Sequence, residues 1–253
     1  MGLTMSREYS RVRDSYDSRT PVFAVANPVD VPRTVDLRPK CSPVENQESE
    51  GSCTGHAFIG AMEHLELVQH QKFTRLSRNF VYYNERLIEG TTRQDAGAQI
   101  ADGIQALKTY GVCEEAVWPY NVHHFKAKPS ADAYIDGLKR RALKCTKISQ
   151  HENTILHFLS EGRPIVFGIV VYESFENEVV AKTGIVPMPD NTKEKCLGGH
   201  AVLMVGYDLN TRMFLVRNSW GIKWGLDGYF WLPFAFVLDP TLSDSFWTVE
   251  RST

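Results

Sequence analysis

Apolar residues in the first two thirds of the chain recur with the spacing of amphipathic helices. The pattern in 53–71 predicts a helix with one buried face, and the pattern in 100–107 predicts a second helix that Gly111 ends. Shorter patterns predict a helix around 82–87 and another over 155–159. The apolar positions that define these helices are Ala57, Phe58, Ala61, Met62, Leu65, Val68, Tyr82, Leu87, Ile100, Ile104, Leu107, Ile155, Leu156 and Leu159.

After Pro164 the pattern changes to β-branched and aromatic runs bounded by Gly, Asp and Asn. The runs are IVFGIVVY, HAVLMVGY, MFLVRN and GYFWL, and each has the length of a strand. A helical first part followed by antiparallel strands predicts an α+β fold of two lobes. We place the helical lobe at about 45–150 and the β lobe at about 151–253, and we expect a functional site in the cleft between them.

Residues 1–30 differ from the rest of the chain. Their first half is polar and charged, and the following stretch contains Pro21, Pro28 and Pro32, which favour an extended run over a helix. We therefore interpret 1–30 as an N-terminal extension and 31–253 as the main domain.

The composition is that of an ordinary globular protein and excludes several classes. The chain has 253 residues, a formal net charge of −2 and 43 % hydrophobic residues, so nucleic acid is not an expected partner. No run of 18 apolar residues is present, so we expect no membrane span. No secretory signal is recognisable, which leaves a cytoplasmic location or export by a non-standard route open.

The chain contains five cysteines, an odd number, so at least one thiol is free or pairs between chains. No C-x-x-C motif occurs, and the Cys196 and His200 pair has no second pair nearby, so no metal or other cofactor is predicted. We expect reduced, partly buried thiols at Cys41, Cys113, Cys145 and Cys196.

Cys53 has a context that favours a nucleophile. It follows Gly51-Ser52 at the start of the first predicted helix, where the helix dipole and unpaired N–H groups stabilise a thiolate. Gln47 lies six residues earlier. A loop that turns from Gln47 into the helix would place its amide beside the sulfur, where it and the Cys53 N–H would form an oxyanion hole.

The strand region supplies a base. His200 begins one predicted strand and Asn218 ends the next, so on adjacent strands the amide of Asn218 could accept from the far ring nitrogen and fix the tautomer. Trp220 follows and would shield that hydrogen bond from water. His56, three residues after Cys53, is a rival base, although a deeper position among apolar residues favours a buried structural histidine.

The blocks PVENQ…GSC, GGHAVLMVGYD and RNSWGIKWGLDGYF resemble the three signature blocks of the papain family of cysteine peptidases. In this chain His200 lies 147 residues after Cys53, and Asn218 lies 165 residues after it. The similarity runs from about Val31 to Glu250. It implies a papain-like two-lobe fold and hydrolysis of peptide bonds through a thioester acyl-enzyme, with Gln47 in the oxyanion hole.

Some positions depart from the family pattern and resemble its bacterial branch. The family's usual cysteine three residues before the nucleophile is Glu50 here, which puts the usual disulfide in doubt, and the aromatic residue after the nucleophile is Thr54. The glycine pair of the helical lobe is Gly97-Ala98, which we expect to bind substrate together with Trp220. Asp95, nearby, is predicted to be a surface residue.

The resemblance also implies a pocket for the second substrate side chain before the cut. Matching SDSFWTV to the end of the family domain places Asp244 at the pocket floor, with Gly168 and Ala201 on its walls. A carboxylate in an otherwise apolar slot would accept an Arg as well as an aromatic side chain. The alternative is that Asp244 caps a turn in the DPTLSDS loop.

Three functions remain to be weighed. The first is a peptidase that acts on proteins or peptides as a monomer. The second is an acyltransferase or transglutaminase-like enzyme, which would use the same three residues. The third is a non-catalytic papain-fold binding or storage protein, which would usually lack the nucleophile that is intact here. The extension would then be either a plug that lies along the cleft, as in a zymogen, through Val22, Phe23 and Val25, or a disordered tail.

Overall fold

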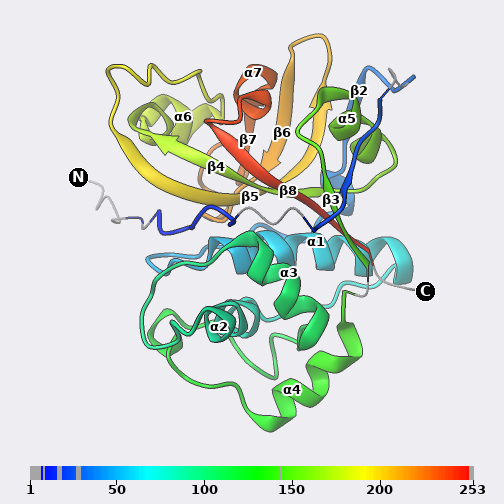
Figure 1. Cartoon of the computed structure of the whole chain (residues 1–253), viewed down its shortest axis with the longest axis vertical. Helices are drawn as coiled ribbons and strands as arrows, with labels where there is room; N and C mark the ends of the chain where they lie inside the picture. Colours follow the sequence, from blue (N-terminus) through cyan, green and yellow to red (C-terminus); the bar gives the residue numbers. More distant parts are fainter. Residues whose placement is uncertain (1–6, 8, 16–18, 27–29, 143, 251–253) are drawn as a thin grey trace.

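The computed structural model describes residues 7, 9–15, 19–26, 30–142 and 144–250. Helices gather in one lobe and a single mixed sheet dominates the other, with the long helix α1 (Cys53–His70) between them (Figure 1). The predicted two-lobe α+β architecture is therefore confirmed.

The helical lobe contains the helices that the apolar periodicity predicted. Ser77 caps the second of them by accepting from the Phe80 N–H, and Gly90 ends it in a left-handed conformation with φ 76°. The helices of this lobe are α1, α2 (Arg78–Glu89), α3 (Ile100–Thr109) and α4 (Ala131–Gly137), with 3-10 turns at Val122–His124 and Leu138–Arg140.

The sheet of the second lobe has the strand order β1-β3-β8-β4-β5-β6-β7, and β2 pairs with β5. All pairs of named strands are antiparallel except β1 with β3. The strands are β1 (Val22–Phe23), β2 (Thr34–Asp36), β3 (Lys144–Ile148), β4 (Ile165–Tyr172), β5 (Cys196–Asp208), β6 (Met213–Arg217), β7 (Tyr229–Pro233) and β8 (Ser243–Glu250). Its helical segments are α5 (Glu152–Ser160), α6 (Glu178–Thr183), α7 (Phe234–Leu238) and the 3-10 turns Arg38–Lys40 and Glu173–Glu176.

Helix α1 is buried on more than the one face that its sequence predicted. Its apolar residues join a core with Val166, Leu203 and Val249 of the sheet, while its polar Glu63 is fully buried and forms an ion pair with Arg78 of α2 at 3.0 Å. Because both lobes pack against this helix, its first residue lies where the two lobes meet.

The first described strand of the sheet after the helical lobe begins earlier than the sequence pattern indicated. β3 precedes Pro164, and its residues are mostly half-exposed, so it lacks the apolar run that identified the later strands.

Among the described residues, no helix is long and apolar enough to cross a membrane. The N-terminal segment, defined here as Arg7 and residues 9–15, runs between the two lobes (Figure 1).

Candidate active site

Cys53 is the first residue of α1, and its side chain is fully buried. Its Sγ accepts a hydrogen bond from the backbone N–H of Ala201 on β5, with the nitrogen and the sulfur 3.4 Å apart. The predicted nucleophile thus comes from the helix between the lobes and is contacted by a strand of the sheet lobe. The helix start and this N–H both favour negative charge on the sulfur.

His200 lies within β5, and Asn218 directly follows β6, the strand that pairs with β5. The Nε2 of His200 and the Oδ1 of Asn218 are 2.9 Å apart, and the Trp220 ring stacks on the imidazole with ring centroids 5.1 Å apart. If Nε2 donates to the amide oxygen, Nδ1 is left to accept a proton from a thiol. This is the geometry that the sequence predicted for the pair.

Gln47 is buried and held at both ends of its amide. Its Oε1 accepts from the Ser219 hydroxyl at 2.5 Å, and its Nε2 donates to the carbonyl of Glu50 at 2.8 Å. The second amide hydrogen remains for another acceptor. The backbone N–H of Gln47 also donates to the Ser219 carbonyl, so the loop before Cys53 is tied to the residue after Asn218.

A second network ties the same loop to the helical lobe. The Asp95 carboxylate accepts from the Gly51 N–H at 3.0 and 3.1 Å and from the Tyr82 hydroxyl. The Tyr82 oxygen in turn accepts from the Gly97 N–H at 3.1 Å. Asp95 is half-buried, so its prediction as a surface residue was wrong: its carboxylate accepts from two donors, the Gly51 N–H and the Tyr82 hydroxyl, which hold it inside the lobe. All five cysteines are free, so no disulfide joins this loop to the helical lobe. The hydrogen bonds to Asp95 make that connection.

His56 lies next to this loop as a buried residue. Its Nδ1 is 3.0 Å from the carbonyl of Ser52, and its ring meets the Tyr120 ring edge-on. Burial lowers the pKa of His56 well below its usual value. These contacts fit a structural histidine better than the base considered as an alternative.

Residues 9–15 cover the groups that the sequence predicted to be catalytic. The Arg11 N–H donates to the carbonyl of Gly199 at 3.2 Å, and the Val12 N–H donates to the carbonyl of Ala98 at 3.3 Å. A side chain at Gly97 would collide with the Ser10 carbonyl, since a Cβ there would lie 2.1 Å from its oxygen. The predicted substrate-binding pair Gly97-Ala98 is therefore occupied by the chain itself, as is Gly199, the β5 residue before His200.

Burial under this segment changes the charge state of the predicted catalytic pair. Burial raises the pKa of Cys53 to about 11, against the smaller opposing effect of the Ala201 N–H. Burial also lowers the pKa of His200 to about 4, despite the hydrogen bond to Asn218. In the covered cleft both groups therefore favour their neutral forms.

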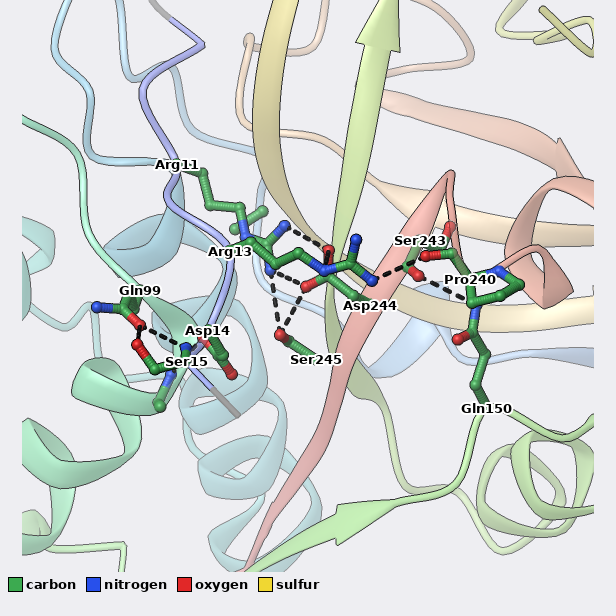
Figure 2. A network of polar contacts seen from close by, with 12 residues as sticks. Arg11, Arg13, Asp14, Ser15, Gln99, Gln150, Pro240, Ser243, Asp244 and Ser245 are labelled. Carbon is green, nitrogen blue, oxygen red and sulfur yellow. Dashed lines mark hydrogen bonds and ion pairs between the residues drawn. The ribbon is translucent and has the colours of Figure 1, made fainter. Parts of the chain in front are cut away.

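Arg11 fills the pocket that the sequence assigned to Asp244. Its guanidinium is bound by the Asp244 carboxylate, with Nη1 and Oδ2 3.0 Å apart, and Figure 2 shows Arg11 and Arg13 both directed toward that carboxylate. A Cβ on Gly168 would lie 2.1 Å from the Arg11 guanidinium carbon, so glycine leaves the room that this side chain uses. Ala201 pairs with Gly168 across β4 and β5.

Asp244 lies within β8, and the turn before that strand is capped by Asp239, which accepts from the Thr241 N–H and hydroxyl. Although burial alone would raise it, the pKa of Asp244 is held below its usual value by the Arg11 guanidinium. The turn-capping alternative for Asp244 therefore does not describe its contacts.

Sequence reasoning missed Glu176, which lies at the other end of the covered cleft. Its carboxylate binds the side chains of Arg7 and Tyr9, and the Arg7 guanidinium lies over the Trp220 ring, 4.1 Å from the ring centroid. Glu176 ends a short 3-10 turn after β4. No motif marks it, and only the three-dimensional approach of the N-terminal segment reveals it.

Known proteins resemble this chain over nearly its whole length. The sequence profile described as "Papain family cysteine protease" matches residues 31–235. An uncharacterised peptidase C1-like protein of Acanthamoeba polyphaga mimivirus is 41 % identical over 233 residues, which cover 88 % of this chain and 74 % of that protein. A viral cathepsin of Cydia pomonella granulosis virus is 29 % identical, over 79 % of this chain and 57 % of its own length.

Solved structures agree with this assignment. Xylellain, a cysteine protease from Xylella fastidiosa, superposes with a TM-score of 0.89 at 33 % identity, covering 100 % of both chains. Procathepsin L 3 of Tenebrio molitor superposes with a TM-score of 0.70 at 18 % identity, over 98 % of this chain and 75 % of that one, which shows the shared fold. The chain belongs to the papain family of cysteine proteases.

Proposed function

We propose that the chain cleaves proteins or peptides internally with Cys53 as nucleophile, His200 as base and Asn218 as the residue that orients the base. The Cys53 sulfur would attack the scissile carbonyl and form a thioester, while His200 passes a proton to the leaving amine. Water, activated by His200, would then release the acyl group. Gln47 and the Cys53 N–H would stabilise the oxyanion.

The observation that carries this proposal is the meeting of three elements at one point. The start of α1 supplies Cys53, the start of the buried part of β5 supplies His200, and the end of β6 supplies Asn218, 2.9 Å from the imidazole.

We further propose that residues 7–15 keep the enzyme latent. A substrate with its second residue before the cut at Asp244 would run, from N to C, from Asp244 toward Trp220. The segment runs the other way, because Arg7 lies at Trp220 and Arg11 at Asp244. Its peptide bonds therefore pass the nucleophile in reverse, which disfavours cleavage of the segment by its own active site.

The most detailed part of the proposal concerns which substrate side chain binds two residues before the cut. Arg11 in the Asp244 pocket supports an enzyme that accepts Arg as the second residue before the cut, with the side-chain stem between Gly168 and the strand wall and its guanidinium on the carboxylate. An aromatic side chain would use the same walls without the ion pair.

The test of the proposed function is hydrolysis by the full-length protein of quenched fluorescent peptides with Arg or Phe at that position. We expect activity that rises when residues 7–15 are displaced, by Arg11→Ala for example, and that disappears in Cys53→Ala. Activity that persists in Cys53→Ala, or a well-folded Arg11→Ala protein that cleaves no peptide, would overturn the assignment.

A further inference from the structure

The second acidic group of the cleft, Glu176, lies on the leaving-group side and its contacts are made by the N-terminal segment. Among the described residues, the hydrogen-bond partners of its carboxylate are the Arg7 guanidinium, at 2.5 Å, and the Tyr9 hydroxyl. When the segment leaves, this half-buried carboxylate loses both partners. It would then face the cleft as a charge without a partner from the rest of the fold.

Trp220 forms the other half of this site. The Arg7 guanidinium carbon lies 4.1 Å from the centroid of the indole ring, well within the range of a cation–π contact. The same indole stacks on the His200 imidazole. A cation held here is therefore close to the predicted catalytic base, and the Arg7 charge is one cause, after burial, of the lowered pKa of His200.

The fold holds Glu176 and Trp220 in fixed relation. Phe175, the residue before the acid, is buried and meets the Trp220 ring at an interplanar angle of 90°, with centroids 5.6 Å apart. It also stacks on Trp224 with centroids 5.8 Å apart. The aromatic cluster therefore anchors the short turn that presents the carboxylate, so the site does not depend on the segment for its shape.

We propose that Glu176 and the face of Trp220 form a binding subsite for an arginine side chain of the substrate, within the first three residues after the cleaved bond. The inference rests on the proposed peptidase function and adds the class of residue that the leaving-group side recognises. Arginine fits better than lysine, because a planar guanidinium can lie on the indole while it binds a carboxylate.

The spacing of the segment sets this range. Arg7 and Arg11 are four residues apart, a span of at most about 13 Å at roughly 3.3 Å per residue in an extended chain. Counted from the Asp244 pocket, which would take the second residue before the cut, four residues reach the third residue after it. Together with Asp244, the subsite would favour substrates with arginine on both sides of the cleaved bond.

The experiment uses the full-length chain carrying Arg7→Ala and Arg11→Ala, in which neither cleft acid keeps its main internal partner. Quenched peptides with Arg fixed at the second position before the cut carry Arg, Lys or norleucine at each of the three positions after it. At one of these positions we expect Arg to raise kcat/KM over norleucine by about tenfold, and Lys by less.

Two further variants in the same background identify the source of that preference. Glu176→Gln should reduce the Arg over norleucine ratio to about threefold or less, because the indole face alone remains. Glu178→Gln is the matched control: it removes the same charge two residues away, where the side chain is exposed and pairs with Lys182, and the ratio should stay near tenfold.

The outcomes separate this inference from the proposed function. Hydrolysis without an arginine preference at any of the three positions, or with a preference that Glu176→Gln leaves intact, would overturn the subsite while leaving the peptidase standing. Absence of Cys53-dependent hydrolysis from every peptide would instead overturn the proposed function. A preference that falls in Glu176→Gln and persists in Glu178→Gln would establish the subsite.

Discussion

Arg11 and Asp244 are 233 positions apart in the sequence, yet Nη1 of the guanidinium lies 3.0 Å from Oδ2 of the carboxylate. Both side chains are almost fully buried, whereas Arg13, which also approaches Asp244, is 59 % exposed. The difference in burial makes Arg11 the anchor of the segment over the cleft and Arg13 a peripheral contact.

Replacing Arg11 should therefore open the cleft. Removing one partner of a buried ion pair costs about 3–5 kcal/mol, whereas an exposed pair contributes about 0–1 kcal/mol. We expect Arg11→Ala to accelerate iodoacetamide labelling of Cys53 by at least tenfold, and the matched variant Arg13→Ala to change it by no more than about fivefold. Equal acceleration by the two variants would argue against Arg11 as the anchor.

Asp244 should also select the substrate. In a background with the segment displaced by Arg11→Ala, Asp244→Ala should lower kcat/KM for peptides with Arg at the second position before the cut by about tenfold or more, an effect of about 1.4 kcal/mol. Peptides with Phe there should change little, because they use the apolar walls. Asp239→Ala, which removes the turn cap before β8, is the control for a loop defect. A parallel loss for both substrates would mean that Asp244 supports the strand and does not read the substrate.

Gln47 should matter for the rate of the chemical step. Loss of one oxyanion donor typically costs about 2.7–4 kcal/mol, or roughly 10²–10³ in kcat, so Gln47→Ala should lower kcat by that factor. Ser219→Ala should lower it less, because Ser219 only holds the amide oxygen of Gln47. Steady-state kinetics on both variants, with thermal unfolding as a check on folding, would test this. A change of less than threefold in Gln47→Ala would assign the role to another donor.

The predicted catalytic residues and the fold follow from local patterns, whereas the cover of the cleft does not. Cys53 begins α1, His200 is the first buried residue of β5, and Asn218 directly follows β6, so elements whose patterns are visible in the sequence bring the three residues together. Arg11 stands in a charged stretch that reads as solvated, and its partner is distant along the chain. The plug was predicted to act through Val22, Phe23 and Val25, but the residues that lie over the predicted catalytic groups are 9–15. Val22 and Phe23 instead form β1, which pairs with β3.

Asp95 and Glu176 were missed for a related physical reason. A single acid in a loop is usually solvated, and only its partners, here the Gly51 N–H and the Arg7 guanidinium, reveal another environment. Those partners approach through the packing of whole lobes and of the N-terminal segment. Neither periodicity nor motif spacing contains that information.

Asp95 should act as a positioning residue for the loop before the nucleophile. Asp95→Asn keeps the shape but removes one acceptor and the charge that the Gly51 N–H and the Tyr82 hydroxyl share. Loss of a hydrogen bond to a charged group costs about 1.5–3 kcal/mol, so kcat should fall by about tenfold or more. Tyr82→Phe should raise KM more than it lowers kcat, since it leaves the Gly97 N–H at the substrate wall without its acceptor. Asp132→Asn, an exposed acid on α4, is the control; an equal effect of all three variants would contradict the assignment.

Glu50 should make the folded protein less stable as the pH rises from 4.5 to 7. It stands in the loop before Cys53, is only 2 % exposed, and neither carboxylate oxygen has a hydrogen-bond partner among the described residues. Burial raises its pKa from 4.5 to about 7, against smaller opposing effects of the Tyr120 and Ser52 hydroxyls. The folded protein therefore binds this proton more tightly than the unfolded chain does. The contribution of Glu50 to stability is complete below pH 4.5, falls between pH 4.5 and 7, and stays low above that range.

Glu50→Gln should remove this dependence. A pKa raised from 4.5 to about 7 corresponds to about 3 kcal/mol of lost stability once the group is ionised. In urea unfolding, the variant should therefore exceed the wild type by up to about 3 kcal/mol at pH 8 and match it near pH 4.5, because a neutral amide resembles the protonated acid in charge. Glu48→Gln, two residues earlier and exposed, should show no such difference at either pH. A Glu50→Gln variant that is less stable than the wild type at pH 8 would mean that the ionised carboxylate is stabilised by partners in the loop, and the expected pH dependence would then be reversed.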